Sequence, residues 1–196
     1  SGERASKHMA NSKRYSFRRI VPLACVVAGL GTLAALVVAH EWGNFRVVSP
    51  GRCYRSAYLD RDELVRSVRK YGIRTVINLR GPNPEEEWYL EETEICRELG
   101  VVHYDIPLRS TVEPTDGQIA YLINLFEHSE EPVLLHCRSG IDRAGLASAI
   151  WLMVMEGAEK AVARKQLSWR YGYLPILGKS AMQGFIDRWR YPPKRR

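Results

Sequence analysis

One stretch of ten residues, HCRSGIDRAG at positions 136–145, has residue types and a spacing that could do chemistry. Five residues separate Cys137 from Arg143, an apolar run at 132–135 precedes them, and a helix-like run follows. This order predicts a strand, a tight loop and a helix, with the thiol at the start of the loop. Such a loop can turn its backbone N–H groups inward around an anion, and the helix N-terminus adds partial positive charge there. The stretch therefore predicts an enzyme that holds a phosphate against a thiolate and removes it from a substrate.

Each residue of the loop has an expected part in this chemistry. A helix N-terminus and a nearby cation both favour the thiolate form of a cysteine, so Cys137 is the candidate nucleophile. The planar guanidinium of Arg143 can grip two phosphate oxygens, and Gly140 lets the backbone close around the anion. His136 is expected to orient the loop by hydrogen bonding, and Ser139 to bond the loop or the phosphate. The candidate catalytic residues of the loop are Cys137 and Arg143, and the candidate substrate-binding residues are Arg138, Ser139, Gly140, Ile141, Asp142 and Arg143.

The expected chemistry needs no cofactor. Attack by a thiolate on phosphorus requires no metal ion, and the sequence shows no cluster of residues with the spacing of metal ligands. We therefore expect neither a metal nor another cofactor.

Together with the strand before it and the helix after it, the loop resembles the HCxxGxxR signature of the cysteine-dependent protein tyrosine phosphatase superfamily. The segments CYRSA at 53–57 and IRTVINLR at 73–80 are similar to the early segments of small bacterial dual-specificity-like members. The resemblance covers roughly residues 44–191. It implies a phosphomonoester phosphatase that works through a phosphocysteine intermediate on Cys137.

The residue after the loop arginine departs from the family pattern. Family loops usually carry Ser or Thr there, and its hydroxyl helps the thiolate leave the phosphocysteine. This chain has Ala144 at that position. We therefore expect slow hydrolysis of the intermediate, unless Ser139 supplies the help.

The general acid also departs from the family pattern. The resemblance implies an Asp about thirty residues before the cysteine, and Asp105 has about that separation but lies inside a strand pattern. At the end of that strand the chain has Arg109-Ser110 instead. Asp142, directly before the loop arginine, resembles the CxxGxDR loops of phosphoinositide and bacterial lipid phosphatases. Asp142 and Asp105 are therefore equal candidates for the proton donor, with Glu113 behind them.

Several functions remain open at this stage. The early segments favour a dual-specificity or tyrosine protein phosphatase, whereas Asp142 and an apolar N-terminal segment favour a lipid or inositol phosphate as substrate. A rhodanese-like sulfurtransferase is an alternative, because Cys-Arg-Ser-Gly also opens those loops, although they are one residue shorter. A phosphate-binding module without turnover is a third reading, which Ala144 and the missing acid motivate.

The apolar pattern and the turn signals predict strands that alternate with helices. We expect strands at 45–48, 53–56, 73–79, 101–108 and 132–136, and helices at 60–72, 83–100, 115–128, 145–155, 158–170 and 179–190. Asp60 and Glu63 form the pattern of a capping box at the start of the first helix. The alternation implies an α/β fold, with a mixed, largely parallel central sheet flanked by helices as in protein tyrosine phosphatases.

Residues 20–39 form an apolar segment without a charge, of about the length that crosses a bilayer. Basic residues precede the segment, and this bias predicts an N-terminus inside and a catalytic domain on the extracytoplasmic, periplasmic side. We expect a transmembrane signal anchor, with a cleavable signal peptide as the alternative because Val37-Val38-Ala39 has small residues at suitable places. The remaining parts are then a tag remnant and basic segment at 1–19, a phosphatase domain at 44–191 and a basic tail at 192–196.

Composition limits the partners. The net charge of +7 is concentrated at the two ends, at 1–19 and 192–196, and leaves the body near neutral without a basic aromatic stripe. We therefore expect no nucleic-acid partner. The partners expected are a phosphorylated protein or phospholipid substrate and the membrane, while the sequence leaves the oligomeric state open. If the domain is exported, Cys53 and Cys96 could pair, although two buried thiols are favoured.

Overall fold

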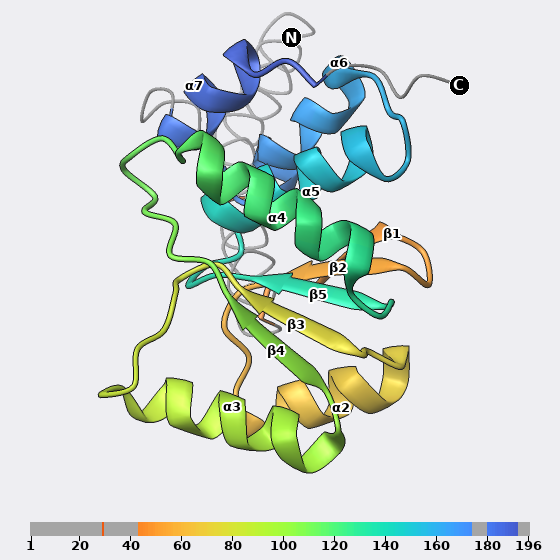
Figure 1. Cartoon of the computed structure of the whole chain (residues 1–196), viewed down its shortest axis with the longest axis vertical. Helices are drawn as coiled ribbons and strands as arrows, with labels where there is room; N and C mark the ends of the chain where they lie inside the picture. Colours follow the sequence, from red (N-terminus) through yellow and green to blue (C-terminus); the bar gives the residue numbers. More distant parts are fainter. Residues whose placement is uncertain (1–28, 30–42, 174–179, 192–196) are drawn as a thin grey trace, which may run out of the picture. The chain divides into compact units, whose positions relative to one another are not determined.

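A computed structural model of the chain describes residues 43–173 and 180–191, with Gly29 alone before them (Figure 1). By its internal contacts the chain divides into two units, residues 1–41 and 42–196, and the second is described here. The predicted membrane segment lies outside the described residues. Within the described ranges, no helix is both long and apolar enough to cross a membrane.

Five short strands form one sheet in the order β1-β2-β5-β3-β4 (Figure 1). β1 runs antiparallel to β2, and the other neighbours are parallel, so the predicted mixed, largely parallel sheet is confirmed. The strands are β1 (Arg46–Ser49), β2 (Cys53–Ser56), β3 (Thr75–Asn78), β4 (Val102–Asp105) and β5 (Val133–His136).

Helices cover both faces of the sheet, as predicted. α2 and α3 lie on one face and α4 and α5 on the other, with α6 and α7 packed against α5 (Figure 1). The helices are α2 (Arg61–Tyr71), α3 (Glu87–Leu99), α4 (Asp116–His128), α5 (Asp142–Val154), α6 (Lys160–Ala163) and α7 (Ala181–Arg188), with two 3₁₀ helices, η1 (Arg164–Leu167) and η2 (Trp169–Tyr171).

Two apolar clusters fill the space between the sheet and its helices. Val76 and Ile77 are neighbours on β3 but belong to different clusters, because consecutive side chains of a strand point to opposite faces. Both are fully buried, so the strand forms a continuous apolar run without alternation. α5 is buried on nearly every side from Ala144 to Trp151. The loop before α5 is therefore backed by a helix that the core holds in place.

The ends of two helices follow the predicted cap signals. Asp60 accepts a 2.8 Å hydrogen bond from the Glu63 N–H, and the Glu63 side chain accepts from the Asp60 N–H, which completes the capping box of α2. Gly72 ends α2 with φ 64°, a left-handed conformation that favours glycine. Thr115 caps α4, which ends at His128 as predicted.

Two predicted helices differ from the structure. The helix predicted over 83–100 begins only at Glu87, because residues 83–86 form a turn and Glu86 is extended, with φ −103° and ψ 127°. The helix predicted over 158–170 is broken into α6, η1 and η2. Side-chain donors take the carbonyls of Gln166 and Leu167, and Ser168 is extended with φ −125° and ψ 171°. A continuous helix would need those carbonyls for its own N–H groups.

Cys53 and Cys96 are buried free thiols, so the alternative of a disulfide is wrong. They belong to the two different apolar clusters, on opposite faces of the sheet. Burial raises the pKa of the Cys96 thiol to about 12 and that of Cys53 well above its ordinary value. Both thiols are therefore inert at neutral pH.

Candidate active site

The predicted loop joins β5 to α5 at the carboxyl edge of the parallel strands. Ligands of open α/β sheets bind at this edge. The strand ends at His136, whose carbonyl accepts a 2.9 Å hydrogen bond from the Leu79 N–H at the end of β3. Cys137 follows and is 1% exposed, and α5 begins at Asp142. The predicted order of strand, loop and helix is confirmed.

Arg55 of β2 holds the far half of the loop. Its Nη2 donates to the carbonyls of Gly140 at 2.6 Å and Ile141 at 3.0 Å. Its Nη1 donates to the carbonyl and the side-chain oxygen of Gln166, at 2.7 and 2.9 Å. The guanidinium also lies over the ring of Tyr171, 4.4 Å from its centroid. Burial lowers the pKa of Arg55 to about 10, so the group stays charged at neutral pH.

Two other donors hold the near half of the loop. The Tyr58 N–H donates to the Arg138 carbonyl at 3.3 Å, and Asn44 Nδ2 donates to the Ser139 carbonyl at 3.2 Å. With Arg55, these donors turn four consecutive carbonyls, 138–141, to the outside of the loop. The carbonyl and N–H of one peptide unit point in opposite directions, so the N–H groups of residues 139–142 turn to the other side. Convergent N–H groups of this kind form an anion-binding nest.

Glycine is required at two positions, one in the loop and one in the helix that follows it. Gly140 has φ 70°, and a Cβ there would lie 2.6 Å from the Ala57 nitrogen. At Gly145, in the first turns of α5, a Cβ would lie 2.8 Å from a Leu167 methyl group. The side-chain hydrogen atom therefore lets the loop pack directly against β2 and η1.

Arg143 and Asp142 leave polar atoms at the loop without a partner. Arg143 Nη1 makes one long hydrogen bond, 3.4 Å, to the Leu108 carbonyl, and its buried Nε has no hydrogen-bond partner among the described residues. Asp142 Oδ1 is also buried without such a partner. Buried polar atoms are rarely left unpaired, so these groups are available to a substrate.

Two of the sequence-predicted proton donors have partners elsewhere. Asp105, at the end of β4, accepts 2.8 Å from Asn78 Nδ2 and 2.6 Å from the Tyr89 hydroxyl, so both of its oxygens are engaged. Glu113 forms an exposed ion pair with Arg188. Of the three candidates, the structure brings only Asp142 into the loop.

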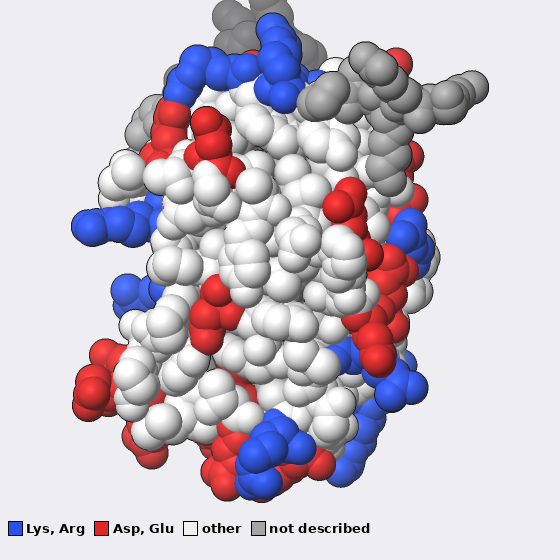
Figure 2. Space-filling model, viewed as in Figure 1, with Lys and Arg blue, Asp and Glu red and all other residues white. Residues whose placement is uncertain are grey.

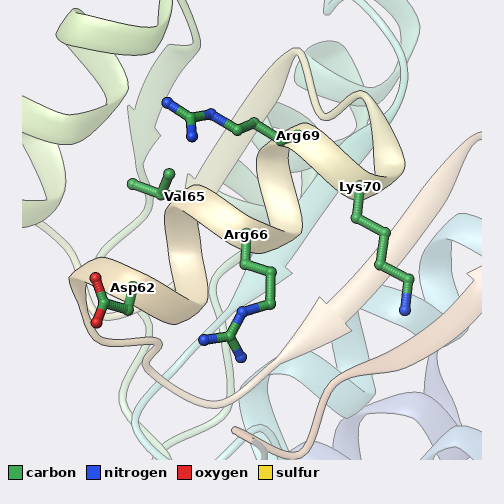
Figure 3. A pocket seen from close by; sticks show the side chains of 5 residues that line it. All are labelled: Asp62, Val65, Arg66, Arg69 and Lys70. Carbon is green, nitrogen blue, oxygen red and sulfur yellow. The ribbon is translucent and has the colours of Figure 1, made fainter.

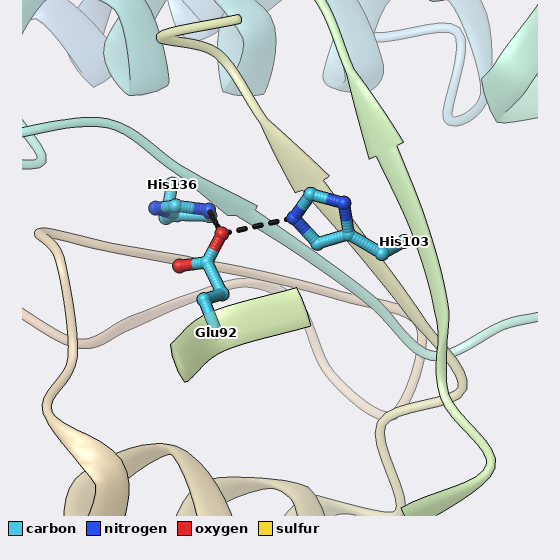
Figure 4. Close-up of side chains that lie close together, drawn as sticks. All are labelled: Glu92, His103 and His136. Atoms are coloured by element: carbon cyan, nitrogen blue, oxygen red, sulfur yellow. Dashed lines mark hydrogen bonds and ion pairs between the residues drawn. The ribbon is translucent and has the colours of Figure 1, made fainter. Parts of the chain in front are cut away.

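The other predicted loop residues take different positions. Arg138 is exposed, and the Ile141 side chain packs next to Gly172 rather than into the loop. Ala144 is fully buried in the first turn of α5. Its methyl group provides no hydroxyl at that position. His136 was expected to orient the loop, but neither of its ring nitrogens has a hydrogen-bond partner among the described residues. Its ring faces Glu92 instead (Figure 4).

A rim of aromatic and cationic side chains stands beside the loop, and sequence reasoning missed it. The Arg80 guanidinium lies 3.4 Å from the centre of the Trp88 ring, and Trp88 meets Tyr58 edge-on at 5.8 Å. Tyr58 is the residue whose N–H holds the Arg138 carbonyl. Burial, and then the charge of Arg143, lower the pKa of Arg80. Arg80 is therefore a third cation near the loop, beside Arg138 and Arg143.

Basic and acidic side chains are mixed on the face seen in Figure 2, where Lys and Arg side chains form separate groups with acidic residues among them. An open surface hollow lies on α2, where the long basic side chains extend away from the helix (Figure 3). It is lined by Asp62, Val65, Arg66, Arg69 and Lys70, none of which belongs to the loop.

Comparison with known proteins identifies the family. The model of the PTP-SAK family, described as Swiss Army Knife protein, DSP-PTPase phosphatase domain, matches residues 43–175. The chain therefore belongs to this family and is a cysteine-dependent phosphatase. This membership decides against the sulfurtransferase alternative. A search of curated proteins gives no match.

Solved structures share the fold at low sequence identity. The core catalytic domain of the PP-IP phosphatase Siw14 from S. cerevisiae has a TM-score of 0.61 and 17% identity, over 75% of this chain and 85% of that chain. TpbA from P. aeruginosa has a TM-score of 0.58 and 21% identity, over 74% and 83% of the two chains. Tk-PTP in its active form has a TM-score of 0.54 and 21% identity, over 75% and 95%.

Proposed function

We propose that this chain is a phosphomonoester phosphatase of dual specificity that acts on phosphorylated proteins, with Cys137 as its nucleophile. The observation that carries the proposal is the outward orientation of carbonyls 138–141, which turns the following N–H groups toward one side of the loop. N–H groups fixed in this way bind the phosphoryl oxygens and stabilise charge that develops on them. The planar fork of Arg143 adds two charged donors at the same place.

The reaction then takes two steps. The Cys137 thiolate attacks phosphorus, the bond from phosphorus to the leaving oxygen breaks, and the protonated Asp142 carboxyl gives that oxygen its proton. Water next attacks the phosphocysteine, Asp142 takes a proton from the water, and the thiolate leaves as inorganic phosphate forms. Ala144 offers no hydroxyl to the departing thiolate, so we expect the second step to limit the rate.

Asp142 is the better proton donor on the available contacts. Its Oδ1 is buried at the loop without a hydrogen-bond partner among the described residues, whereas Asn78 and Tyr89 occupy both oxygens of Asp105. A carboxyl that already accepts two hydrogen bonds is held away from a leaving group. This difference supports Asp142 over Asp105, which sequence reasoning left equal.

The choice between Asp142 and Asp105 as general acid is tested with two substrates whose leaving groups differ in their need for a proton. Asp142→Asn should reduce kcat/KM for phenyl phosphate by about 10²–10⁴-fold and reduce kcat/KM for p-nitrophenyl phosphate much less, because nitrophenolate leaves without a proton. Asp105→Asn is the matched control and should change both rates equally. A larger selective loss in Asp105→Asn would reverse the assignment.

A lipid or inositol phosphate is the second candidate substrate. Arg80, Arg138 and Arg143 place more positive charge around the loop than one phosphate group requires. Siw14, which shares the fold, is a PP-IP phosphatase, whereas TpbA has been observed in complex with pTyr. The two structures therefore support different substrates. We expect the rim of Arg80 and Trp88 to contact the part of the substrate that differs between them.

The proposal is tested on the purified full chain. Cys137→Ser should abolish hydrolysis of phosphotyrosine peptide and leave phosphate binding intact. Hydrolysis that survives this substitution would refute the mechanism, and wild-type protein that binds phosphate without turnover would establish the binding-module alternative. A parallel assay with phosphoserine peptide, phosphoinositide and phosphatidylglycerol phosphate separates the substrates, since activity confined to lipids would overturn the protein-phosphatase proposal.

We also propose that residues 20–39 anchor the chain in a membrane, with the phosphatase domain on the extracytoplasmic side. The uncharged apolar run and the basic residues before it support this orientation. Protease added to intact cells or spheroplasts should then degrade the domain. Protection from the protease would contradict the orientation.

A further inference from the structure

Three side chains with metal-ligand chemistry meet beneath the loop, and the proposed reaction does not use them as a group. Glu92 comes from α3, His103 from β4 and His136 from the end of β5 (Figure 4). Their side chains are 3%, 11% and 2% exposed. Two imidazoles and a carboxylate therefore share a buried site between the sheet and α3.

The ligand atoms of the three side chains converge on one point. Glu92 Oε1 lies 2.9 Å from His103 Nε2 and 3.1 Å from His136 Nε2, and all three atoms lie within 4.8 Å of one another. The contact with His103 is a hydrogen bond. The contact with His136 is an ion pair, and neither ring nitrogen of His136 makes a well-aligned hydrogen bond among the described residues. A buried nitrogen without such a bond can take a ligand.

The donor types of the site suit a metal ion. Imidazole nitrogens and carboxylate oxygens both bind transition metals such as zinc. Buried charges in proteins are either paired or bound to metals, and here one carboxylate lies between two imidazoles.

We propose that Glu92, His103 and His136 bind a zinc ion. Two histidine nitrogens and one carboxylate oxygen are a known zinc set, with bonds of about 2.0–2.2 Å. A tetrahedral site of that size places its ligand atoms about 3.3 Å apart, close to the two distances from Glu92 Oε1. Water supplies the fourth ligand. Asp105 Oδ2 lies 3.9 Å from His103 Nδ1, on the side where carboxylates orient metal-bound imidazoles.

A zinc ion at this point would link α3, β4 and β5. One of its ligands, His136, directly precedes Cys137. The inference does not depend on the proposed function, because the ion takes no part in the two reaction steps. It differs from the expectation, drawn from the sequence, that the chain binds no metal. The three ligands are far apart in the sequence and show no ligand spacing, so only the fold brings them together.

The test is zinc binding by the full chain after chelator treatment, measured by competition with a chromogenic zinc indicator. Wild-type protein should bind one Zn²⁺ at this site. His103→Gln and Glu92→Gln should each weaken binding at least about a hundredfold, since loss of an outer-shell partner alone costs 10–100-fold. Mg²⁺ should not compete, because it prefers oxygen ligands.

Three controls separate this site from other zinc ligands. His128→Gln, an exposed histidine on α4, should bind zinc like the wild type. A His8→Gln, His40→Gln double variant should do the same, as should Cys137→Ser. Loss of binding in Cys137→Ser would place the metal on the thiol, and unchanged affinity in both His103→Gln and Glu92→Gln would refute the site. Circular dichroism of the metal-free variants checks their folding.

Discussion

Replacing Arg55 by lysine would test whether outward-turned carbonyls hold the loop in shape. Arg55 is fully buried, and its terminal nitrogens donate four hydrogen bonds. Two go to the loop carbonyls of Gly140 and Ile141, and two go to Gln166. Lysine keeps the charge but has one nitrogen and no planar fork. It therefore cannot reach both the loop and Gln166 in the same way.

The expected loss follows from the number of bonds. A hydrogen bond to a charged group contributes about 1.5–3 kcal/mol, so losing two of the four destabilises by about 3–6 kcal/mol. Burying a charge is unfavourable for both residues, so this cost largely cancels in the comparison. We expect the free energy of unfolding to fall by about 3 kcal/mol or more. We expect kcat/KM to fall at least about tenfold, because the loop N–H groups lose their fixed orientation.

Urea denaturation and p-nitrophenyl phosphate kinetics measure the two effects. Arg52→Lys is the matched control, since Arg52 lies immediately before β2 and pairs with Glu131 and Glu156 at the surface. It should change stability by less than about 1 kcal/mol and leave kcat/KM unchanged. The reasoning is refuted if Arg55→Lys matches the wild type in both unfolding midpoint and kcat/KM.

Three further substitutions have defined outcomes. Gly140→Ala puts a Cβ 2.6 Å from the Ala57 nitrogen, at a residue with φ 70°. The free energy of unfolding should therefore fall by about 1–3 kcal/mol, and kcat should be almost completely lost. A fully active variant would contradict the close approach. Ala144→Ser introduces the hydroxyl that family loops usually carry after the arginine. Steady-state kcat should then rise severalfold, and any pre-steady-state burst of product should shrink. An unchanged burst would mean that hydrolysis of the phosphocysteine is not limiting. Burial and the hydrogen bond to Asp105 raise the pKa of Tyr89 to about 12, above the unfolded value near 10. The contribution of Tyr89 is therefore complete below pH 10 and is lost as pH rises toward 12, so urea unfolding should decline less over this range in Tyr89→Phe than in wild type.

Features that depend on neighbours in the chain were predictable. The capping box at Asp60 and the left-handed end at Gly72 are set by side chains within one helical turn. The loop from Cys137 to Arg143 was also predictable, because its strand, glycine and helix start all lie within a few residues. Local signals thus predicted the strand, the loop and the helix around Cys137 and Arg143 before any contact was known.

Features that depend on the order of strands were not predictable. Arg55 reaches Gly140 across 85 residues because β2 pairs with β5. Asp105 had a suitable distance from the cysteine in sequence, but the pairing of β3 with β4 puts it opposite Asn78, which takes one of its oxygens. The sequence signal for such a contact was a charged residue, Arg55, inside a predicted strand. The structure shows that this strand is fully buried.

The loop is held by residues from both ends of the domain, which has a consequence for the order of assembly. Asn44 and Arg55 come from its beginning, while Gln166 and Tyr171, which anchor Arg55, come from near its end. During synthesis the loop cannot take its final shape until η2 has left the ribosome and packed against β2. Enzymatic activity therefore requires the chain through η2, and a chain shortened before η2 would keep its sheet residues but remain inactive.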